Sequence, residues 1–369
     1  MTTINPYKII VAGGGTGGHI FPAVSIANAF KQMYSDANIL FVGAKGKMEM
    51  EKVPKEGYEI IGLDIAGFNR SSLLKNISLP FKIVKSFLQA RKILKEFKPD
   101  AVVGVGGFAS FSVLYMAQRL GIPTLIQEQN SFAGKSNKIL GKKANVICVA
   151  YDNMEKFFPK EKIVKTGNPI RQTIAHNQIT KEQGIQFFNL NHHQKVVFAF
   201  GGSLGARSIN QAIFNHIKQF AENNIQLIWQ TGTAFFEKAK DACKQFESTI
   251  KVYDFLREMD YAYSTADLII SRAGASSISE LSIVAKPVVF VPFPYASEDH
   301  QTHNAMALVK HNAAAILKDS ETDSQLFNTI LHFINDENGC SEMTQNIKAF
   351  AMLDADKLIA QHLKRIINK

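Results

Sequence analysis

The segment KIIVAGGGTGGH at residues 8–19 decides the fold, because it joins a short apolar run, a glycine-rich loop and the start of a helix. A second segment of the same design, KVVFAFGGSLGA, follows about half a chain later at residues 195–206. Short buried strands that alternate with helices form parallel sheets with right-handed crossovers. The sequence therefore predicts an α/β protein with two Rossmann-like domains that face each other across a cleft.

Further apolar runs, bounded by Gly, Pro or Asn, continue this pattern in both halves. Such runs are typical of strands that are buried on both faces of a parallel sheet. We expect strands at residues 9–12, 39–42, 101–105, 124–126 and 146–149, and then at 196–200, 225–230, 250–253, 268–270 and 288–291. Helical spacing between them predicts helices at residues 21–33, 82–97 and 209–220.

Glycine and proline cluster in TGNP at residues 166–169, after the last expected strand of the first half. Such a cluster marks a loop between structured segments. We therefore place the N-terminal domain at residues 1–167 and the C-terminal domain at 168–343. The segment 344–369 has helical spacing, and we expect it to cross back to the first domain.

The composition narrows the class of protein. The 369 residues are 46% hydrophobic and 20% charged, which excludes a disordered chain. The three cysteines, Cys148, Cys243 and Cys340, are too dispersed for a zinc cluster or a disulfide framework and indicate a reducing compartment. No stretch has the pattern of an export signal or of a membrane-spanning helix, so we expect a soluble protein.

The positive charge is concentrated in the first half. Residues 1–168 contain 23 Lys and Arg against 12 Asp and Glu, whereas residues 169–369 contain 19 against 20. Residues 71–98 mix apolar side chains with seven Lys and Arg and one acidic residue, Glu96. This pattern is typical of a helix that lies on an anionic membrane leaflet. The alternative is a core-packed helix with a solvated basic face. Nucleic acid is not favoured, because the few aromatic side chains of the stretch, such as Phe81 and Phe87, do not make an extended stacking platform.

The first glycine loop fits the pattern G-x-G-x-x-G at Gly13, Gly15 and Gly18. Glycines there allow a backbone to approach a phosphate at the start of a helix. A dinucleotide site also needs an acidic residue at the end of the second strand, and FVGA at residues 41–44 has none. His19 follows the loop, where the helix N-terminus keeps an imidazole neutral, as a general base must be. A tight turn without a ligand and a structural histidine are the alternatives.

Polar side chains follow other expected strands. GVGGFAS at residues 104–110 offers a second anion-binding loop, and Glu128 lies just beyond the strand at 124–126. In the second half, GGSLGA at 201–206 and SRAGASSISE at 271–280 suit the diphosphate of a nucleotide, with Glu280 within reach of the ribose. Asp299, His300 and His303 lack a further ligand set, so a metal site is not favoured.

Seven ordered motifs together resemble the MurG family of peptidoglycan N-acetylglucosaminyltransferases. They are GGGTGGHIFPA (13–23), GVGGFAS (104–110), EQNSFAGKSN (128–137), GNPIR (167–171), GGSLGA (201–206), SRAGASSISE (271–280) and DHQTHNA (299–305). The resemblance implies a GT-B architecture and an inverting transfer of N-acetylglucosamine (GlcNAc) from UDP-GlcNAc to the C4 hydroxyl of the N-acetylmuramic acid (MurNAc) of lipid I, which forms lipid II. It further implies a peripheral enzyme on the cytoplasmic face of the inner membrane, without a cofactor or an active-site metal.

The resemblance also assigns roles to residues by their position in these motifs. His19 is the first candidate for the general base, and Glu128 is the second. Gly104, Gly106 and Gly107 would face the acceptor diphosphate. The residues that would bind UDP-GlcNAc are Thr16, Gly17, Gly18, Asn130, Arg171, Ser203, Leu256 (through its backbone amide, at the uracil), Ala275, Ser276, Glu280 (at the ribose) and Gln301 (at the sugar hydroxyls).

Two positions depart from the commoner pattern of the family. Gln127 stands where a histidine often precedes Glu-Gln-Asn, and Leu204 replaces a frequent glutamine. Two other functions remain open at this point: a GT-B glycosyltransferase with another lipid or a small acceptor, and a non-catalytic UDP-sugar-binding protein.

Overall fold

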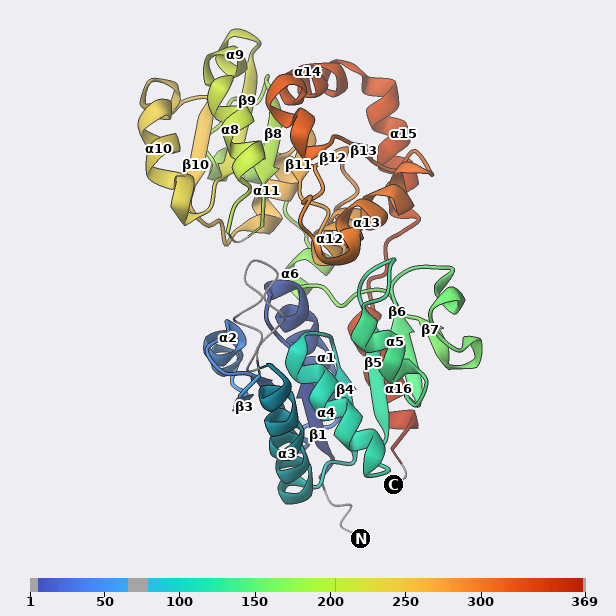
Figure 1. Cartoon of the computed structure of the whole chain (residues 1–369). Coiled ribbons are helices and arrows are strands. Elements are labelled where there is room, and N and C mark those ends of the chain that lie inside the picture. The colour runs from blue at the N-terminus through green and yellow to red at the C-terminus, as the bar shows by residue number, and fades with distance from the viewer. Residues whose placement is uncertain (1–5, 66–78, 203, 368–369) are drawn as a thin grey trace. The chain divides into compact units, whose positions relative to one another are not determined.

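The chain divides into two compact units (Figure 1). The computed structural model describes residues 6–65, 79–202 and 204–367. Unit 1 is Met1–Ile170 together with Asp354–Lys369, and unit 2 is Arg171–Leu353. The first break therefore falls within the GNPIR motif, and the second falls ahead of the last helix.

Unit 1 contains, in its described part, a parallel sheet of seven strands in the order β3-β2-β1-β4-β5-β6-β7. Its strands are β1 (Lys8–Ala12), β2 (Asn38–Ala44), β3 (Glu59–Leu63), β4 (Ala101–Gly104), β5 (Thr124–Glu128), β6 (Val146–Val149) and β7 (Ile163–Lys165). Its helices are α1 (Gly17–Met33), α2 (Glu49–Lys55), α3 (Leu79–Phe97), α4 (Phe108–Arg119), α5 (Lys135–Gly141) and α16 (Ala355–Arg365), with short 3₁₀ turns at Met154–Lys156 and Lys160–Lys162.

Strand β1 shows why this sheet is a central layer. Ile9 and Val11 belong to a hydrophobic cluster that includes residues of α1 and α16. The intervening Ile10 and Ala12 belong to a second cluster, which includes residues of α3, α4 and α5. Since successive side chains of a strand point to opposite faces, both faces of the sheet are covered by helices.

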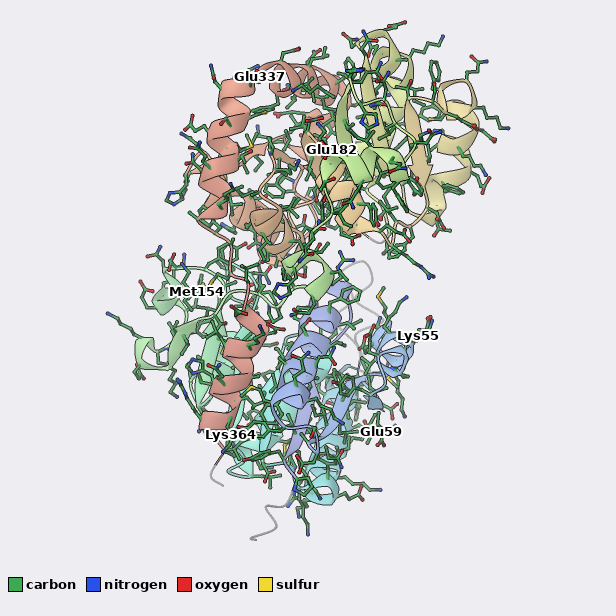
Figure 2. The ribbon with its side chains drawn as sticks, turned by 180° about the vertical axis from the view of Figure 1, so that it is seen from behind. Lys55, Glu59, Met154, Glu182, Glu337 and Lys364 are labelled. Atoms are coloured by element: carbon green, nitrogen blue, oxygen red, sulfur yellow. The ribbon has the colours of Figure 1, made fainter. Side chains whose placement is uncertain are left out.

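The last helix of the chain completes the core of unit 1. Ile359 and Leu363 of α16 are fully buried in the same cluster as β1 and α1. Figure 2 shows α16, with Lys364 labelled, in the lower half of the view, and the Lys364 ammonium group lies 5.1 Å from the centre of the Tyr7 ring. The preceding helix, α15 (Glu337–Lys348), lies in unit 2, so the segment expected at 344–369 is divided between the two units.

Unit 2 repeats the arrangement with six described parallel strands in the order β10-β9-β8-β11-β12-β13. They are β8 (Lys195–Phe200), β9 (Ile225–Gln230), β10 (Ile250–Tyr253), β11 (Leu268–Ser271), β12 (Val288–Phe290) and β13 (Ala315–Ile316). The helices are α6 (Gln172–Ala175), α7 (Lys181–Phe187), α8 (Arg207–Asn215), α9 (Ile217–Glu222), α10 (Thr233–Cys243), α11 (Met259–Thr265), α12 (Ala275–Val284), α13 (His300–Val309), α14 (Thr322–Asn335) and α15, with 3₁₀ turns at Lys244–Phe246, Ser297–Asp299 and Asp319–Glu321.

The prediction of two parallel Rossmann-like sheets is confirmed. The structure adds β3, β7 and β13, which the sequence analysis did not predict, and it divides the helix expected at 209–220 into α8 and α9. Glu128 is the last residue of β5 rather than a loop residue. Among the helices of the described ranges, none combines the length and apolar character needed to cross a membrane.

Candidate active site

In unit 1, the loop after β4 packs directly on the glycine loop after β1. A β-carbon built on Gly107 would lie 2.5 Å from the carbonyl oxygen of Gly14, and one built on Gly106 would lie 2.8 Å from Nε2 of His19. Both glycines also have positive φ angles, 98° at Gly106 and 86° at Gly107. These two positions therefore require glycine. Gly104 differs, since it ends β4 in a buried position against Leu114.

His19 lies in the first turn of α1, directly after Thr16, Gly17 and Gly18. Its Nδ1 is 3.1 Å from the carbonyl oxygen of Gly14 and 3.4 Å from the Thr16 hydroxyl. A carbonyl oxygen can only accept, so this contact selects the tautomer with the proton on Nδ1. Nε2 is then the nitrogen able to take up a proton, and it is the atom beside Gly106.

Glu128 is buried, with 2% of its surface exposed, and its carboxylate organises the loop that follows β5. Oε1 accepts hydrogen bonds from the backbone N–H (3.0 Å) and the side-chain amide (3.2 Å) of Asn130. Oε2 accepts from the N–H of Gly134 (3.1 Å) and the amide of Asn137 (2.8 Å). A carboxylate offers about four acceptor positions, so these four donors fill the group.

A buried glutamine pair lies next to this loop. The Gln127 amide donates to Asn168 Oδ1 at 2.8 Å, and the Gln129 amide donates to Val105 O at 2.7 Å and also to Gln127 Oε1. The two side chains thereby connect the loops after β4 and β5 with the segment after β7. Gln127, the position that departs from the family pattern, is thus part of the framework of the loop.

Glu49, in the first turn of α2, is a site residue that the sequence analysis missed. It is 1% exposed, and its Oε2 accepts the N–H of Gly15 at 2.7 Å while its Oε1 accepts the N–H of Ala44 at 3.0 Å. One donor of the first glycine loop is therefore used by a carboxylate of the protein itself. No sequence motif predicts this contact, because Gly15 and Glu49 are 34 residues apart in the sequence.

In unit 2, the residues predicted to form an anion site lie at the N-terminus of α12. Gly274 precedes the helix in an extended conformation, and Ala275 and Ser276 form the first turn. The first N–H groups of a helix have no acceptor within it, which favours an anionic ligand there. The Ser276 hydroxyl is buried and has no hydrogen-bond partner in the described part of the chain, so it is a further donor for such a ligand.

Arg171 and Glu280 form a bidentate ion pair. Arg171 Nε lies 2.9 Å from Oε1 of Glu280 and Nη2 lies 3.0 Å from Oε2, which also accepts the Tyr263 hydroxyl at 3.0 Å. Burial alone would lower the pKa of Arg171, but the charge and hydrogen bonds of Glu280 outweigh burial and raise it. Burial, reinforced by the Glu280 charge, raises the pKa of Tyr263 well above its usual value, so its hydroxyl remains a donor.

The other residues predicted to bind the donor in unit 2 are placed as follows. The Leu256 N–H donates to Gln230 Oε1 at 3.0 Å, so a uracil contact through this N–H requires Gln230 to release it. Oε1 of Gln301 accepts a hydrogen bond from the Phe293 N–H at 2.9 Å, so the NH₂ group of Gln301 points away from Phe293. Ser203 lies outside the described residues.

Arg272 was not assigned by the sequence analysis, and it fixes the segment that leads to Gln301. It is 9% exposed and donates to the carbonyl oxygens of Val291 (3.0 Å) and Pro292 (3.1 Å). It also pairs with Asp319 at 2.5 Å. These contacts hold the loop after β12.

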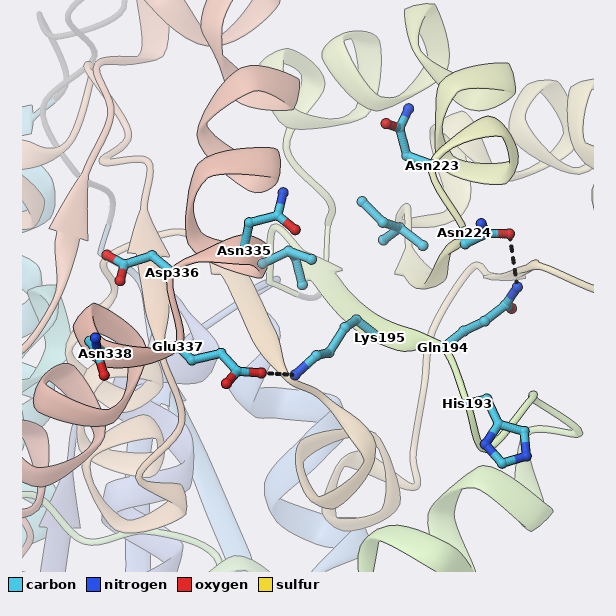
Figure 3. A pocket seen from close by; sticks show the side chains of 11 residues that line it. His193, Gln194, Lys195, Asn223, Asn224, Asn335, Asp336, Glu337 and Asn338 are labelled. Atoms are coloured by element: carbon cyan, nitrogen blue, oxygen red, sulfur yellow. Dashed lines mark hydrogen bonds and ion pairs between the residues drawn. The ribbon is translucent and has the colours of Figure 1, made fainter.

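A cavity of about 520 Å³ in unit 2 lies away from these motifs (Figure 3). Lys195 and Ile225, which line it, are the first residues of β8 and β9, so the cavity is at the amino ends of the strands. Its other lining residues include His193, Asn224 and Glu337, and the Lys195 ammonium group lies 3.6 Å from Glu337.

In the ranges that the structure describes, no group of three or more His, Cys, Asp or Glu side chains could hold a metal ion.

Two Rossmann-like sheets with glycine-rich loops at the carboxyl ends of their strands are typical of nucleotide-sugar glycosyltransferases of the GT-B class, and the comparisons agree. The N-terminal domain of glycosyltransferase family 28 matches residues 9–149, and the C-terminal domain of that family matches residues 196–359. The chain therefore belongs to glycosyltransferase family 28.

Individual relatives are similar over nearly the whole chain. A protein of Parabacteroides distasonis, named UDP-N-acetylglucosamine--N-acetylmuramyl-(pentapeptide) pyrophosphoryl-undecaprenol N-acetylglucosamine transferase, is 50% identical over 364 residues, which are 98% of this chain and 99% of the relative. A protein of Phocaeicola vulgatus with the same name is 50% identical over 98% of this chain and 97% of its own. The crystal structure of Acinetobacter baumannii MurG superposes with a TM-score of 0.76 at 29% identity, covering 98% of this chain and all of the other.

Proposed function

We propose that this protein transfers GlcNAc from UDP-GlcNAc to the C4 hydroxyl of the MurNAc of lipid I, with inversion, and so forms lipid II and UDP. The observation that carries the proposal is the 50% identity to transferases named for this reaction, over 98% of the chain. The reaction belongs to peptidoglycan synthesis, and thus to cell-wall biogenesis.

Unit 2 binds the nucleotide end of the donor in this proposal. Ala275, Ser276 and the N-terminus of α12 receive the diphosphate, whose negative charge grows as UDP leaves. Glu280 accepts a hydrogen bond from a ribose hydroxyl. Its carboxylate can do so because Arg171 and Tyr263 use three of its four acceptor positions and leave one on Oε1. The pair with Arg171 holds the carboxylate in place for this contact. In this proposal Ser203 contacts the diphosphate, the Leu256 N–H contacts the uracil, and Gln301 contacts the sugar hydroxyls.

Unit 1 binds the acceptor and supplies the base. The loop of Gly106 and Gly107 faces the acceptor diphosphate, and Nε2 of His19 takes the proton from the C4 hydroxyl. The hydroxyl oxygen then bonds to C1 of GlcNAc while the bond from C1 to the phosphate oxygen breaks and UDP departs with the electron pair. We assign Glu128 to ordering the Asn130 loop, because four donors already surround its carboxylate.

Thr16, Gly17, Gly18 and Asn130 are assigned to UDP-GlcNAc as well. The first three lie at the start of α1, where helix N–H groups favour an anion. These dipoles and the Arg171 charge stabilise the transition state without a metal ion or another cofactor.

The lipid substrate requires the enzyme to reach a membrane, and α3 is the element that we assign to this contact. Phe81, Val84 and Leu88 follow one another at helical spacing and are 79%, 59% and 62% exposed. Lys82, Lys85, Arg91, Lys92 and Lys95 surround them and are exposed too. An apolar stripe bordered by cations suits a peripheral contact with an anionic leaflet, here the cytoplasmic face of the inner membrane. Residues 71–78 of the predicted docking stretch, including Lys75, lie outside the described residues.

A donor and acceptor screen tests the proposal. Purified protein is incubated with radiolabelled UDP-GlcNAc and either a soluble lipid I analogue or a matched prenyl diphosphate sugar that lacks MurNAc. We expect transfer to the lipid I analogue, in EDTA as well as in buffer. Transfer to the non-muramoyl acceptor alone would favour another GT-B transferase, and binding of UDP-GlcNAc without turnover would favour a non-catalytic protein.

A further inference from the structure

Glu49 is the one acidic side chain whose hydrogen bonds, among those of the described residues, reach the glycine loop of unit 1. Its two oxygens accept two backbone N–H groups from different segments, Gly15 in the loop after β1 and Ala44 at the end of β2. The carboxylate is 1% exposed, so water does not compete for these contacts. Glu49 thus joins the loop that precedes His19 to the rigid end of a strand.

The fit around this carboxylate is close. A β-carbon on Gly14 would lie 2.2 Å from Cδ of Glu49, and one on Gly43 would lie 2.5 Å from its Cγ. Gly14 has a φ of 145° and Gly15 a φ of 90°. The loop therefore adopts a backbone that suits glycine, and it does so with the carboxylate packed against it.

The same segment sets the orientation of His19. Gly14, whose carbonyl oxygen lies 3.1 Å from His19 Nδ1, directly precedes Gly15, whose N–H donates to Glu49. The Gly14 carbonyl and the Gly15 N–H belong to one planar peptide unit, so fixing the N–H also fixes the direction of the carbonyl. Two hydrogen bonds, one on each side of this peptide, lead from the Glu49 carboxylate to the His19 ring.

We propose that Glu49 is a positioning residue of the transfer reaction, which holds the Gly14–Gly15 peptide so that its carbonyl keeps the proton of His19 on Nδ1 and leaves Nε2 as the base. The proposal rests on the proposed function, in which His19 removes the proton of the acceptor hydroxyl. Glu49 contacts no substrate in this role and acts through the peptide and the ring.

Glu49→Gln is the informative substitution. Glutamine keeps the size of the side chain, but its NH₂ group must face either the Gly15 N–H or the Ala44 N–H, so one of them loses its acceptor. We expect kcat to fall by about 10- to 100-fold, as for small displacements of a catalytic group, with a smaller change in KM for UDP-GlcNAc. Glu51→Gln is the matched control, because Glu51 lies on the same helix, is 67% exposed and pairs with Lys55.

Nitrogen NMR of the His19 ring separates the positioning role from the catalytic one. The ¹⁵N shifts distinguish a protonated from an unprotonated nitrogen, and the loss of a signal in His19→Ala assigns it. We expect Glu49→Gln, but not Glu51→Gln, to alter the ¹⁵N shifts of the two His19 ring nitrogens, which we call the His19 pattern. If glutamine prevents folding, as thermal unfolding would reveal, Glu49→Asp serves instead, since its shorter carboxylate cannot span both N–H groups.

An unchanged His19 pattern in folded Glu49→Gln would overturn the positioning role, whatever happens to the rate. An altered pattern with an unchanged kcat would support the structural link and overturn the assignment of His19 as the base. A change in both supports the proposal.

Discussion

Replacing Arg91 and Lys95 with glutamine should weaken binding of the protein to anionic vesicles about 30-fold. These residues follow Leu88 by three and seven positions, so they share its exposed face on α3. Neither forms an ion pair with a described residue. A cation near an anionic leaflet contributes about 1 kcal/mol, so two contribute about 2 kcal/mol, and about 1.4 kcal/mol corresponds to a tenfold change in partitioning.

Lys85 offers a matched control on the same helix. Its ammonium group lies 2.8 Å from Asp64, which also pairs with Lys45 at 2.9 Å. Hydrogen bonds from Lys85, Lys45 and Gln89 hold the pKa of Asp64 below its usual value, so its carboxylate is charged at neutral pH and offsets part of the Lys85 charge. We therefore expect Lys85→Gln to weaken vesicle binding by less than either Arg91→Gln or Lys95→Gln.

Sedimentation with sucrose-loaded vesicles measures the effect. Vesicles of phosphatidylglycerol and phosphatidylcholine are compared with phosphatidylcholine alone at low and high salt. The difference between variants should shrink at about 1 M salt, where the Debye length is about 3 Å. Equal sedimentation of the double variant and the unmodified protein with anionic vesicles would refute the reasoning and leave α3 as a packed helix with a solvated basic face.

Three further substitutions test the site and the fold. His19→Ala should lower kcat by about 10²- to 10⁴-fold, the usual contribution of a general base, with little change in KM for UDP-GlcNAc; wild-type turnover would remove His19 from this role. Tyr263→Phe should weaken UDP binding in calorimetry by about tenfold, because Glu280 loses a hydrogen bond that holds its carboxylate in place and the displacement costs part of the about 1.5–3 kcal/mol of a hydrogen bond to a charged group; unchanged affinity would argue against the Glu280 assignment. Leu363→Ala should lower the free energy of unfolding of unit 1 by about 2–5 kcal/mol in urea, whereas Leu353→Ala, 47% exposed, should change it little.

Most strands that were predicted from the sequence are buried, and β10 is the exception, because three of its four residues are half-buried. The predicted bounds of β9 and β10 match the structure, since both strands are rich in apolar residues and have polar residues directly outside each end. Strands β3, β7 and β13 were missed, and most of their residues are half-buried. Each of the three lies at an edge of its sheet, where fewer neighbours cover it.

The glycine loops were predictable because their demands are local. Gly106 and Gly107 have positive φ angles, and glycine is the residue that adopts such angles most readily, so the residue type itself indicates the loop. The carboxylate contacts were not predictable, since the Glu49 bond to Gly15 and the Arg171 pair with Glu280 join residues 34 and 109 positions apart. The partner of the Leu256 N–H was not predictable either. The motif indicates a backbone donor at this position, but it does not indicate that Gln230 accepts its hydrogen bond.

Placing α16 in unit 1 has a consequence for synthesis of the protein on the ribosome. Unit 2 is one continuous stretch, but unit 1 lacks Ile359 and Leu363 of its core until α16 has been synthesised. At about 5–20 residues per second, the chain from Arg171 onward takes roughly 10–40 s to make. The earlier-made unit is thus the later one to be completed, and a nascent chain halted before residue 354 would expose the apolar side of α1 to chaperones.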